Sequence, residues 1–409
     1  MEAALAVESP ARGVQERVVG FVAEVTARLP HRRQRENAGL YVRGLVEHGG
    51  RKSVQPTLFR LGEDGARYES VQQFLADSPW DPTLVVRACA ERVAAEIAVL
   101  AWIVDDTSVK KDGKHSPGVK RQWSGTLGKI DNCQITVSVH AVGARGTVPL
   151  GWRLYLPQEW CDDLPRRRKA KIPDAVGFET KAQLAASLVE EAVGWEIPTA
   201  PILADAGYGD DTAFRTRASE GGLEYVVAVS PNVRVFGPET RFAAPTRRAR
   251  GGSPTVARPD RRSEPVAALA ERLPAEAWRT LPYRTTPAGE EVESRFAFLR
   301  VVVAADAADR DHHPPRSEWL IIEWPQGADG PSDYWLSNLG EDEPRHRLAR
   351  LARLRWTIEL DYHRLKGELG LDHYEGRSYL GFHHHCALVT CAHAFLTLEQ
   401  LGPQAPRPA

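Results

Sequence analysis

The sequence predicts an α/β protein, with a mixed sheet covered by helices and a helical region before it. Strand-like and helical segments alternate between residues 98 and 230, which is typical of a sheet with helices packed on it. Residues 13–97 instead carry apolar side chains at helical spacing. Because 409 residues exceed the size at which one hydrophobic core stops growing, we expect several modules.

The first module, residues 13–97, is predicted to be mainly helical and to follow a disordered start at residues 1–12. One apolar stripe consists of Val14, Val18, Phe21, Val22, Val25 and Leu29. The glycines at 49–50 would end a second helix, and Ser70 would cap a short third one. Short helices with basic residues between them suit a DNA-binding domain. No helix-turn-helix pattern is distinct, however, and a helical scaffold is an equal alternative.

The α/β module, residues 98–230, places two acidic residues at the ends of predicted strands. The predicted strands are residues 98–105, 132–140, 149–156 and 223–230, and residues 180–193 have helical periodicity. Asp106 follows the apolar run at 98–104, and Asp205 follows the run at 200–204.

Residues 231–338 are predicted to form a β-rich insertion that begins with a basic arm. Residues 231–262 carry eight arginines, Arg247, Arg248 and Arg250 among them, against two acidic residues. Such a patch would follow a phosphate backbone, although a solvated loop is an equal alternative. Strands are expected to resume at 294–304, 317–324 and 334–337.

The last module, residues 339–401, is predicted to consist of two helices. A long helix over 343–369 begins behind Pro344 and an acidic turn, as helix starts favour, and Gly370 closes it. A second helix runs from about Gly381 to Leu401, and residues 402–409 form a proline-rich tail.

The composition argues against a membrane protein. No apolar run reaches the roughly 20 residues that span a bilayer, and residues 1–12 do not resemble a signal peptide. The five cysteines are scattered and form no CxxC pair, so neither a disulfide framework nor a zinc site is expected. A reducing cytoplasm is the predicted compartment. The net charge of −1 does not by itself favour nucleic acid.

Three separate acidic residues suggest a two-metal site. Carboxylates of Asp106, Asp205 and Glu359, at two strand ends and on one helix, are the ligands that a pair of Mg²⁺ ions requires for attack on a phosphodiester. An acid at a strand end is more often a turn or cap residue, so each signal is weak alone. Asp105 competes with Asp106, and since neighbouring strand residues point to opposite faces, only one of them can join the site.

One face of the long helix would support this chemistry. At about 100° per residue, Arg355, Glu359 and Lys366 fall on the same side, with Tyr362 near them. A carboxylate flanked by two cations and a phenol suits metal and phosphate binding, although an ion-pair lattice on a surface helix is the commoner meaning of such a pattern.

Two further signals rank lower. The run His383–His385, near His373 and His393, would suggest a metal cluster, but consecutive helical residues diverge by about 100°, so a packed or DNA-facing helix start is favoured. Trp123, beside Gln122, is expected in the core, with contact to an unpaired base as the alternative.

Four long motifs resemble those of DDE transposases encoded by bacterial insertion sequences. They are Asp105-Asp-Thr-Ser-x-x-Lys-x-Gly-Lys114-His115-Ser-x-Gly-Val119, Gln122-Trp-Ser-Gly-x-Leu-Gly-Lys-x-x-Asn-Cys-Gln134, Ala204-Asp-Ala-Gly-Tyr-Gly209 and the run from Trp356 to Arg377 with Gly381-Phe-His-His-His385. The resemblance covers roughly residues 40–400, with the motifs in the same order.

This resemblance implies a ribonuclease H-like core with Asp106, Asp205 and Glu359 as ligands of two Mg²⁺ ions, for which Mn²⁺ would substitute. Arg355, Glu359 and Lys366 match the spacing of a Tyr-Arg-Glu-Lys motif, whereas Ala352 stands at its tyrosine position, for which Tyr362 would substitute.

The resemblance further implies a bacterial DNA transposase, associated with the nucleoid when bound to DNA. Its partners would be the terminal inverted repeats of its element, target DNA and a second copy of the chain. The expected DNA-binding residues are Arg355, Lys366, Tyr362, Arg247, Arg248, Arg250, Lys114 and His115. Two alternatives stay open: a catalytically silent DNA-binding regulator, and a ribonuclease H-like nuclease that cuts without joining.

Overall fold

The computed structural model describes residues 10–47, 49–125, 128–243, 258–286, 288–305 and 315–402. Its fold class is the predicted one, a large mixed sheet with helices on it. Five helices come first, and they confirm the helical character of residues 13–97. They are α1 (Pro10–Val25), α2 (Arg32–Val46), α3 (Val54–Arg60), α4 (Gly65–Ala76) and α5 (Pro82–Ile97).

Two helix starts differ from the sequence prediction. Helix α1 already begins at Pro10, so residues 10–12 belong to a helix rather than to a disordered start, while residues 1–9 lie outside the described part. Helix α4 begins at Gly65 because the Asp64 carboxylate accepts a hydrogen bond from the backbone N–H of Arg67 and so caps the helix. Ser70, the predicted cap, lies inside α4, where its hydroxyl accepts a hydrogen bond from the Asn37 amide on α2 (3.0 Å).

The sheet has twelve strands in the described part of the chain, in the order β10-β7-β12-β13-β14-β6-β5-β1-β3-β2, with β4 on β3 and β11 on β12. Its central strands are β1 (Val99–Lys110), β2 (Lys120–Ser124), β3 (Lys129–Gly143), β4 (Gly146–Leu154), β5 (Ile202–Ala204) and β6 (Tyr225–Ala228). Strand β1 pairs antiparallel with β3 and parallel with β5, and β5 pairs parallel with β6. This mixed arrangement agrees with the ribonuclease H-like core that the resemblance implied.

Helices α6 to α10 connect these strands. They are α6 (Gln158–Asp162), α7 (Leu164–Lys169), α8 (Lys181–Val193), α9 (Ala206–Gly209) and α10 (Thr212–Glu220). Helix α8 is the helix predicted for residues 180–193, and its first turn is capped by Thr180, whose hydroxyl accepts from the backbone N–H of Gln183.

The region predicted as a β-rich insertion extends the central sheet. Strand β14 pairs antiparallel with β6, so the insertion and the core share one continuous set of backbone hydrogen bonds. Its elements are β7 (Arg234–Phe236), β8 (Phe242–Ala243), β9 (Arg258–Pro259), β10 (Glu264–Pro265), α11 (Val266–Glu271), a 3₁₀ turn η2 (Ala275–Ala277), β11 (Arg279–Thr285), β12 (Glu291–Val303), β13 (Glu318–Trp324) and β14 (Asp333–Ser337).

The long helix predicted for residues 343–369 is two helices, α12 (Arg345–Leu354) and α13 (Thr357–Gly367). At the junction, the backbone N–H groups of Ile358 and Glu359 donate to the carbonyls three residues before them, at 3.1 and 3.0 Å. Such tight turns interrupt the ordinary helical ladder without a proline or glycine, which is why the sequence pattern did not predict the break.

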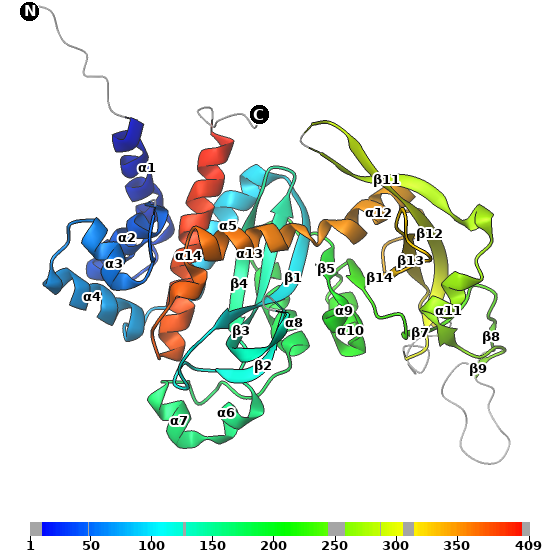
Figure 1. The fold of residues 1–409 in the computed structure, drawn as a ribbon, viewed down its shortest axis with the longest axis horizontal. Coiled ribbons are helices and arrows are strands. Elements are labelled where there is room, and N and C mark those ends of the chain that lie inside the picture. The colour runs from blue at the N-terminus through cyan, green and yellow to red at the C-terminus, as the bar shows by residue number, and fades with distance from the viewer. Residues whose placement is uncertain are drawn as a thin grey trace, which may run out of the picture.

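The last helix in the described part of the chain is α14 (Tyr379–Leu401), which follows the 3₁₀ turn η4 (Leu371–His373) and confirms the predicted last helix. Helix α14 packs against α2, α5 and β4, and Figure 1 shows it in red between the blue N-terminal helices and the sheet. Figure 1 also shows α12 and α13 in orange, crossing from the insertion toward the N-terminal helices. No helix in the described ranges is long and apolar enough to cross a membrane.

Candidate active site

The two neighbouring aspartates of β1 point to opposite faces of the sheet. The carboxylate of Asp105 accepts a hydrogen bond from Arg355, just before α13, at 2.8 Å. The carboxylate of Asp106 instead accepts hydrogen bonds from the Lys181 ammonium of α8, at 3.0 and 3.1 Å, and from the Tyr208 hydroxyl of α9, at 3.3 Å. The alternation expected of a strand is therefore present, and the two carboxylates have different partners.

Asp205 lies at the end of β5, next to β1 in the sheet. It caps the short helix α9, and its carboxylate accepts a hydrogen bond from the backbone N–H of Gly207 at 2.9 Å. A side chain at Gly209 would meet the carbonyl oxygen of Ala228 at 1.9 Å, so only glycine permits this close approach to β6. The Asp-Ala-Gly-Tyr-Gly motif thus combines an acid, a tight turn and the tyrosine that contacts Asp106.

Glu359 lies in the first turn of α13, and its side chain is 64% exposed. The nearest charged partner is Arg355, whose Nη2 lies 3.6 Å from Glu359 Oε1. Since Nη1 of the same guanidinium bonds Asp105, Arg355 connects the strand carboxylate to the helix carboxylate. The ion pair expected between positions 355 and 359 is present, and it is part of a wider group of charges.

A cavity of about 380 Å³ contains two of the predicted acids, Asp205 and Glu359. It lies between the core and the insertion, because side chains of α12, α13 and β11 line it together. Asp333 adds a third carboxylate, and the cationic and aromatic lining consists of Tyr283, Arg284, Trp335, Arg353, Arg355 and Trp356. Three arginines beside three carboxylates make this a site where a phosphate group and a metal ion would both find partners.

Burial raises the pKa of Asp105 to about 7. The guanidinium of Arg355 opposes this rise, whereas the charges of Asp205 and Asp106 add to it. Asp105 is therefore near enough to both other aspartates to respond to their charge. The Arg355 cation therefore limits how far burial raises the pKa of Asp105.

Helix α13 is held on the sheet by a buried polar network. The Asp361 carboxylate accepts a hydrogen bond from the Thr147 hydroxyl at 2.6 Å and bonds His140 at 2.9 Å. The ammonium of Lys366 donates to the Ser108 carbonyl at 2.8 Å, and the hydroxyls of Tyr362 and Ser138 lie 2.8 Å apart. Tyr362, expected to contact DNA, is thus buried and ties α13 to β3.

The motif residues of β3 hold the loop that carries Lys114 and His115. The amide of Gln134 donates to the carbonyl of Pro117 at 2.6 Å, and the amide of Asn132 donates to the carbonyl of Gly113 at 3.0 Å. Both Lys114 and His115 are exposed on this loop. Their side chains remain available as predicted DNA contacts.

The histidines of α14 have structural surroundings. The side chains of His383, His384 and His385 are buried, and each ring bonds a backbone carbonyl, for example His385 to Gly370 at 3.0 Å. This confirms that the run is a packed helix start, in the protein interior. Trp123, expected in the core, is instead 62% exposed on β2, which stands at one end of the strand order.

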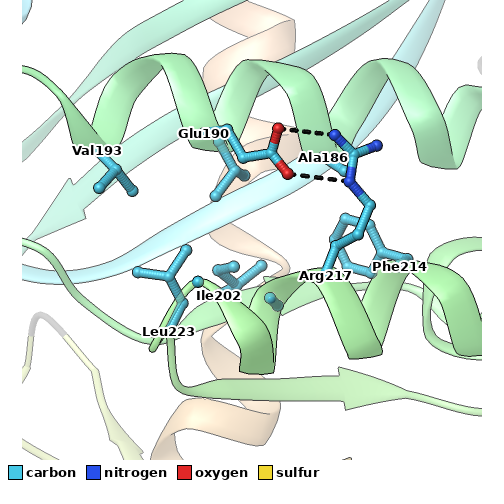
Figure 2. A pocket seen from close by; sticks show the side chains of 10 residues that line it. Ala186, Glu190, Val193, Ile202, Phe214, Arg217 and Leu223 are labelled. Atoms are coloured by element: carbon cyan, nitrogen blue, oxygen red, sulfur yellow. Dashed lines mark hydrogen bonds and ion pairs between the residues drawn. The ribbon is translucent and has the colours of Figure 1, made fainter.

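A second cavity shares no lining residue with this site. A smaller apolar cavity, about 110 Å³, lies between α8 and α10, where the Glu190–Arg217 ion pair (2.7 Å) spans its edge (Figure 2). It contains none of the predicted site residues. Arg247, Arg248 and Arg250 of the predicted basic arm lie outside the described residues.

The donor atoms suit a hard divalent cation, because Mg²⁺ and Mn²⁺ prefer carboxylate oxygens. Asp105, Asp205 and Glu359 supply such oxygens around Arg355 and the cavity. Among the residues that the structure describes, no group of three or more His, Cys, Asp or Glu side chains is close enough together to hold a metal ion. In this arrangement Arg355 balances the charge of the acids.

Sequence reasoning missed several residues of this site. Lys181 and Tyr208 contact Asp106, while Arg284 and Arg353 enter the cavity from β11 and α12. Tyr208 and Trp356 stand inside the quoted motifs, which was a usable signal. The others come from segments without a motif, so only the folded chain identifies them.

Carboxylates within β1, directly after β5 and at the start of α13, beside arginines, form an acidic site of the kind that metal-dependent nucleases use. Residues 24–288 match a family described as DDE superfamily endonuclease, and the chain belongs to this family. The matched region contains Asp105, Asp106 and Asp205, and Glu359 lies beyond it.

A relative with an assigned role is similar over part of the chain. Over 194 residues the chain is 30% identical to a protein of Microchaete diplosiphon named "Probable transposase for insertion sequence element IS701". The match covers 46% of this chain and 47% of that protein, so the chain spans about half the length of the curated relative.

Proposed function

We propose that this protein is a DNA transposase that cleaves and joins the ends of an insertion sequence by two-metal phosphodiester chemistry. The observation that carries the proposal is the gathering of acids from β1, the end of β5 and the start of α13 beside the arginines of one cavity. Membership of the DDE endonuclease family and the similarity to a probable transposase support it.

The metal ligands in this proposal are Asp205, Glu359 and an aspartate of β1, which the sequence places at Asp106. Two Mg²⁺ ions, or Mn²⁺ in their place, would supply an activated nucleophile and stabilise the leaving oxygen. Arg284, Arg353 and Arg355 line the cavity and would hold phosphates of the bound strand. Exposed Glu359 can approach a ligand in the cavity without rearrangement of the core.

DNA is the proposed partner, as terminal inverted repeats of the element and as target. The N-terminal helices and the basic residues of 231–262 would recognise the ends, with Lys114 and His115 as further contacts. Since two ends have to be brought together, the working form would be a homodimer. A cytoplasmic, nucleoid-associated location would follow from this role.

The test is a cleavage and joining assay with labelled DNA that carries the element's ends, with Mg²⁺, for the wild type and Asp205→Asn. Asparagine keeps a capping oxygen for α9, so a loss of activity would report on the ligand rather than on the cap. Nicks at the ends and joined products, both lost in the variant, are expected.

Two other outcomes would contradict the proposal. Binding of end DNA without any nicks would indicate a DNA-binding regulator. Nicks without joining, even with paired ends present, would indicate a ribonuclease H-like nuclease.

A further inference from the structure

We infer that Asp105, rather than Asp106, is the aspartate of β1 that would bind metal. Before metal binds, the guanidinium of Arg355 occupies the position beside Asp105 that the metal ion would take. This inference rests on the proposed function and refines its ligand set. It differs from the sequence expectation, which placed the ligand at Asp106.

Asp105 and α13 lie on the same face of the sheet. Asp105 lies opposite Ser138 in the β1–β3 register, and Ser138 bonds Tyr362 of α13. Opposite residues of an antiparallel pair have their side chains on the same face. Asp105 is therefore on the face that α13 covers, which is the helix that carries Glu359.

The guanidinium of Arg355 contacts both Asp105 and Glu359. Its two terminal nitrogens lie 2.8 Å from Asp105 Oδ2 and 3.6 Å from Glu359 Oε1. One cation thus serves both carboxylates. Arg355 also lines the cavity with Asp205 and Glu359, so displacement of this side chain by a divalent ion would join Asp105 to the other two acids.

Asp106 has different partners from those of Asp105. Both of its carboxylate oxygens receive the Lys181 ammonium, and Tyr208 adds a hydroxyl donor. These partners belong to α8 and α9, on the other face of β1. Asp106 therefore acts as a positioning residue that fixes these helices near the turn after Asp205.

Mn²⁺ binding to the full-length protein tests the inference without relying on catalysis. Titration followed by electron paramagnetic resonance would compare the wild type with the matched neighbours Asp105→Asn and Asp106→Asn. We expect a loss of affinity of at least about tenfold for Asp105→Asn and of less than about threefold for Asp106→Asn. Thermal unfolding would confirm that each variant is folded.

A second measurement needs no variant. Fe²⁺ bound in place of Mn²⁺, with ascorbate and peroxide, cuts the backbone near the metal, and we expect cuts in β1 and at the start of α13. Cuts at the start of α8 without cuts in α13 would overturn the inference. Equal or greater loss of Mn²⁺ affinity in Asp106→Asn, or no Mn²⁺ binding by the wild type, would overturn it too.

These results separate the inference from the proposed function. If Mn²⁺ binds through Asp105 but end DNA is never cut, the assignment of Asp105 stands and the transposase proposal fails.

Discussion

Acidic side chains close together in the sequence differ in their exposure to solvent, and this difference sets their chemical roles. Glu359 is largely exposed at the cavity, whereas Asp361, two residues later, is buried against His140. Burial by itself would raise the pKa of Asp361, but hydrogen bonds and charge from His140 and His393 outweigh it and lower that pKa. Of these two acids, Glu359 is therefore the one suited to bind a ligand from solution.

Glu359→Gln is predicted to lose DNA cleavage and to keep binding to end DNA. The amide removes one anionic ligand but preserves the size of an exposed side chain, so cleavage should fall on the order of 10²–10³-fold. A gel-shift assay and a cleavage assay on the same DNA would measure both. Glu368→Gln, an exposed glutamate at the end of α13, is the control; cleavage near the wild-type rate in Glu359→Gln would remove Glu359 from the site.

Acid is predicted to destabilise the protein through the buried histidines of α14. Burial lowers the pKa of His383 and of His385 from 6.5 to about 4. Both are neutral when folded but accept protons near pH 6.5 when unfolded. Their stabilising contribution is therefore complete above pH 6.5 and is lost as the pH falls toward 4.

The expected loss is on the order of 2 kcal/mol per histidine at pH 5. Urea unfolding at pH 7 and pH 5 would measure it, and His385→Gln should show a smaller change between the two pH values. The same pH dependence in the variant and the wild type would contradict this role of His385.

At the scale of elements, α13 depends on one buried polar cluster for its position. Asp361 bonds Thr147 on β4 and His140 on β3, so one carboxylate fixes the helix over two strands. The position of Asp205 is set in a similar way, by the end of β5 and by the glycines of α9. Asp205 and Glu359 thus lie at the start of helices that other residues fix, whereas Asp105 and Asp106 lie within β1.

Asp361→Asn is predicted to lower the free energy of unfolding by about 3–5 kcal/mol. The reason is that the buried side chains of His140 and Thr147 would lose the carboxylate with which they pair. Chemical denaturation would measure the change, with Glu368→Gln as the exposed control at the end of α13. A loss below about 1 kcal/mol would show that the cluster does not anchor the helix.

At the scale of the whole molecule, the candidate site belongs to both the core and the insertion. Strand β14 continues the core sheet through β6, and this brings β11, with Tyr283 and Arg284, to the cavity. The insertion is therefore part of the site and not a separate appendage. Arg247, Arg248 and Arg250 belong to the same stretch of sequence, residues 231–338, and lie outside the described residues.

Replacing Arg247, Arg248 and Arg250 together by glutamine is predicted to weaken DNA binding at low salt and to flatten its salt dependence. Each lost phosphate contact should reduce the slope of log K against log salt by about 0.9. Fluorescence anisotropy at several salt concentrations would measure the slope. As a control, Lys169 at the end of α7 and Lys171 just after it would be replaced by glutamine. An unchanged slope in the arginine variant would mean that residues 247–250 do not contact DNA.

The sequence by itself determined the class of the fold, most of the central strands, α8, α14 and the acidic motifs. These features depend on periodicity, capping and motif chemistry, which involve residues close together in the sequence. It also indicated that only one of Asp105 and Asp106 can face the site, because side chains alternate along a strand.

Only the tertiary structure decided which face of β1 meets α13, where the predicted long helix breaks, and that the insertion joins the core sheet. These outcomes depend on contacts between residues far apart in the chain, such as Arg355 with Asp105 and Tyr362 with Ser138. Trp123 is exposed for the same reason, since its surroundings are set by which elements pack on β2. Local sequence patterns carry no information about such partners, whereas packing and charge pairing in the folded chain fix them.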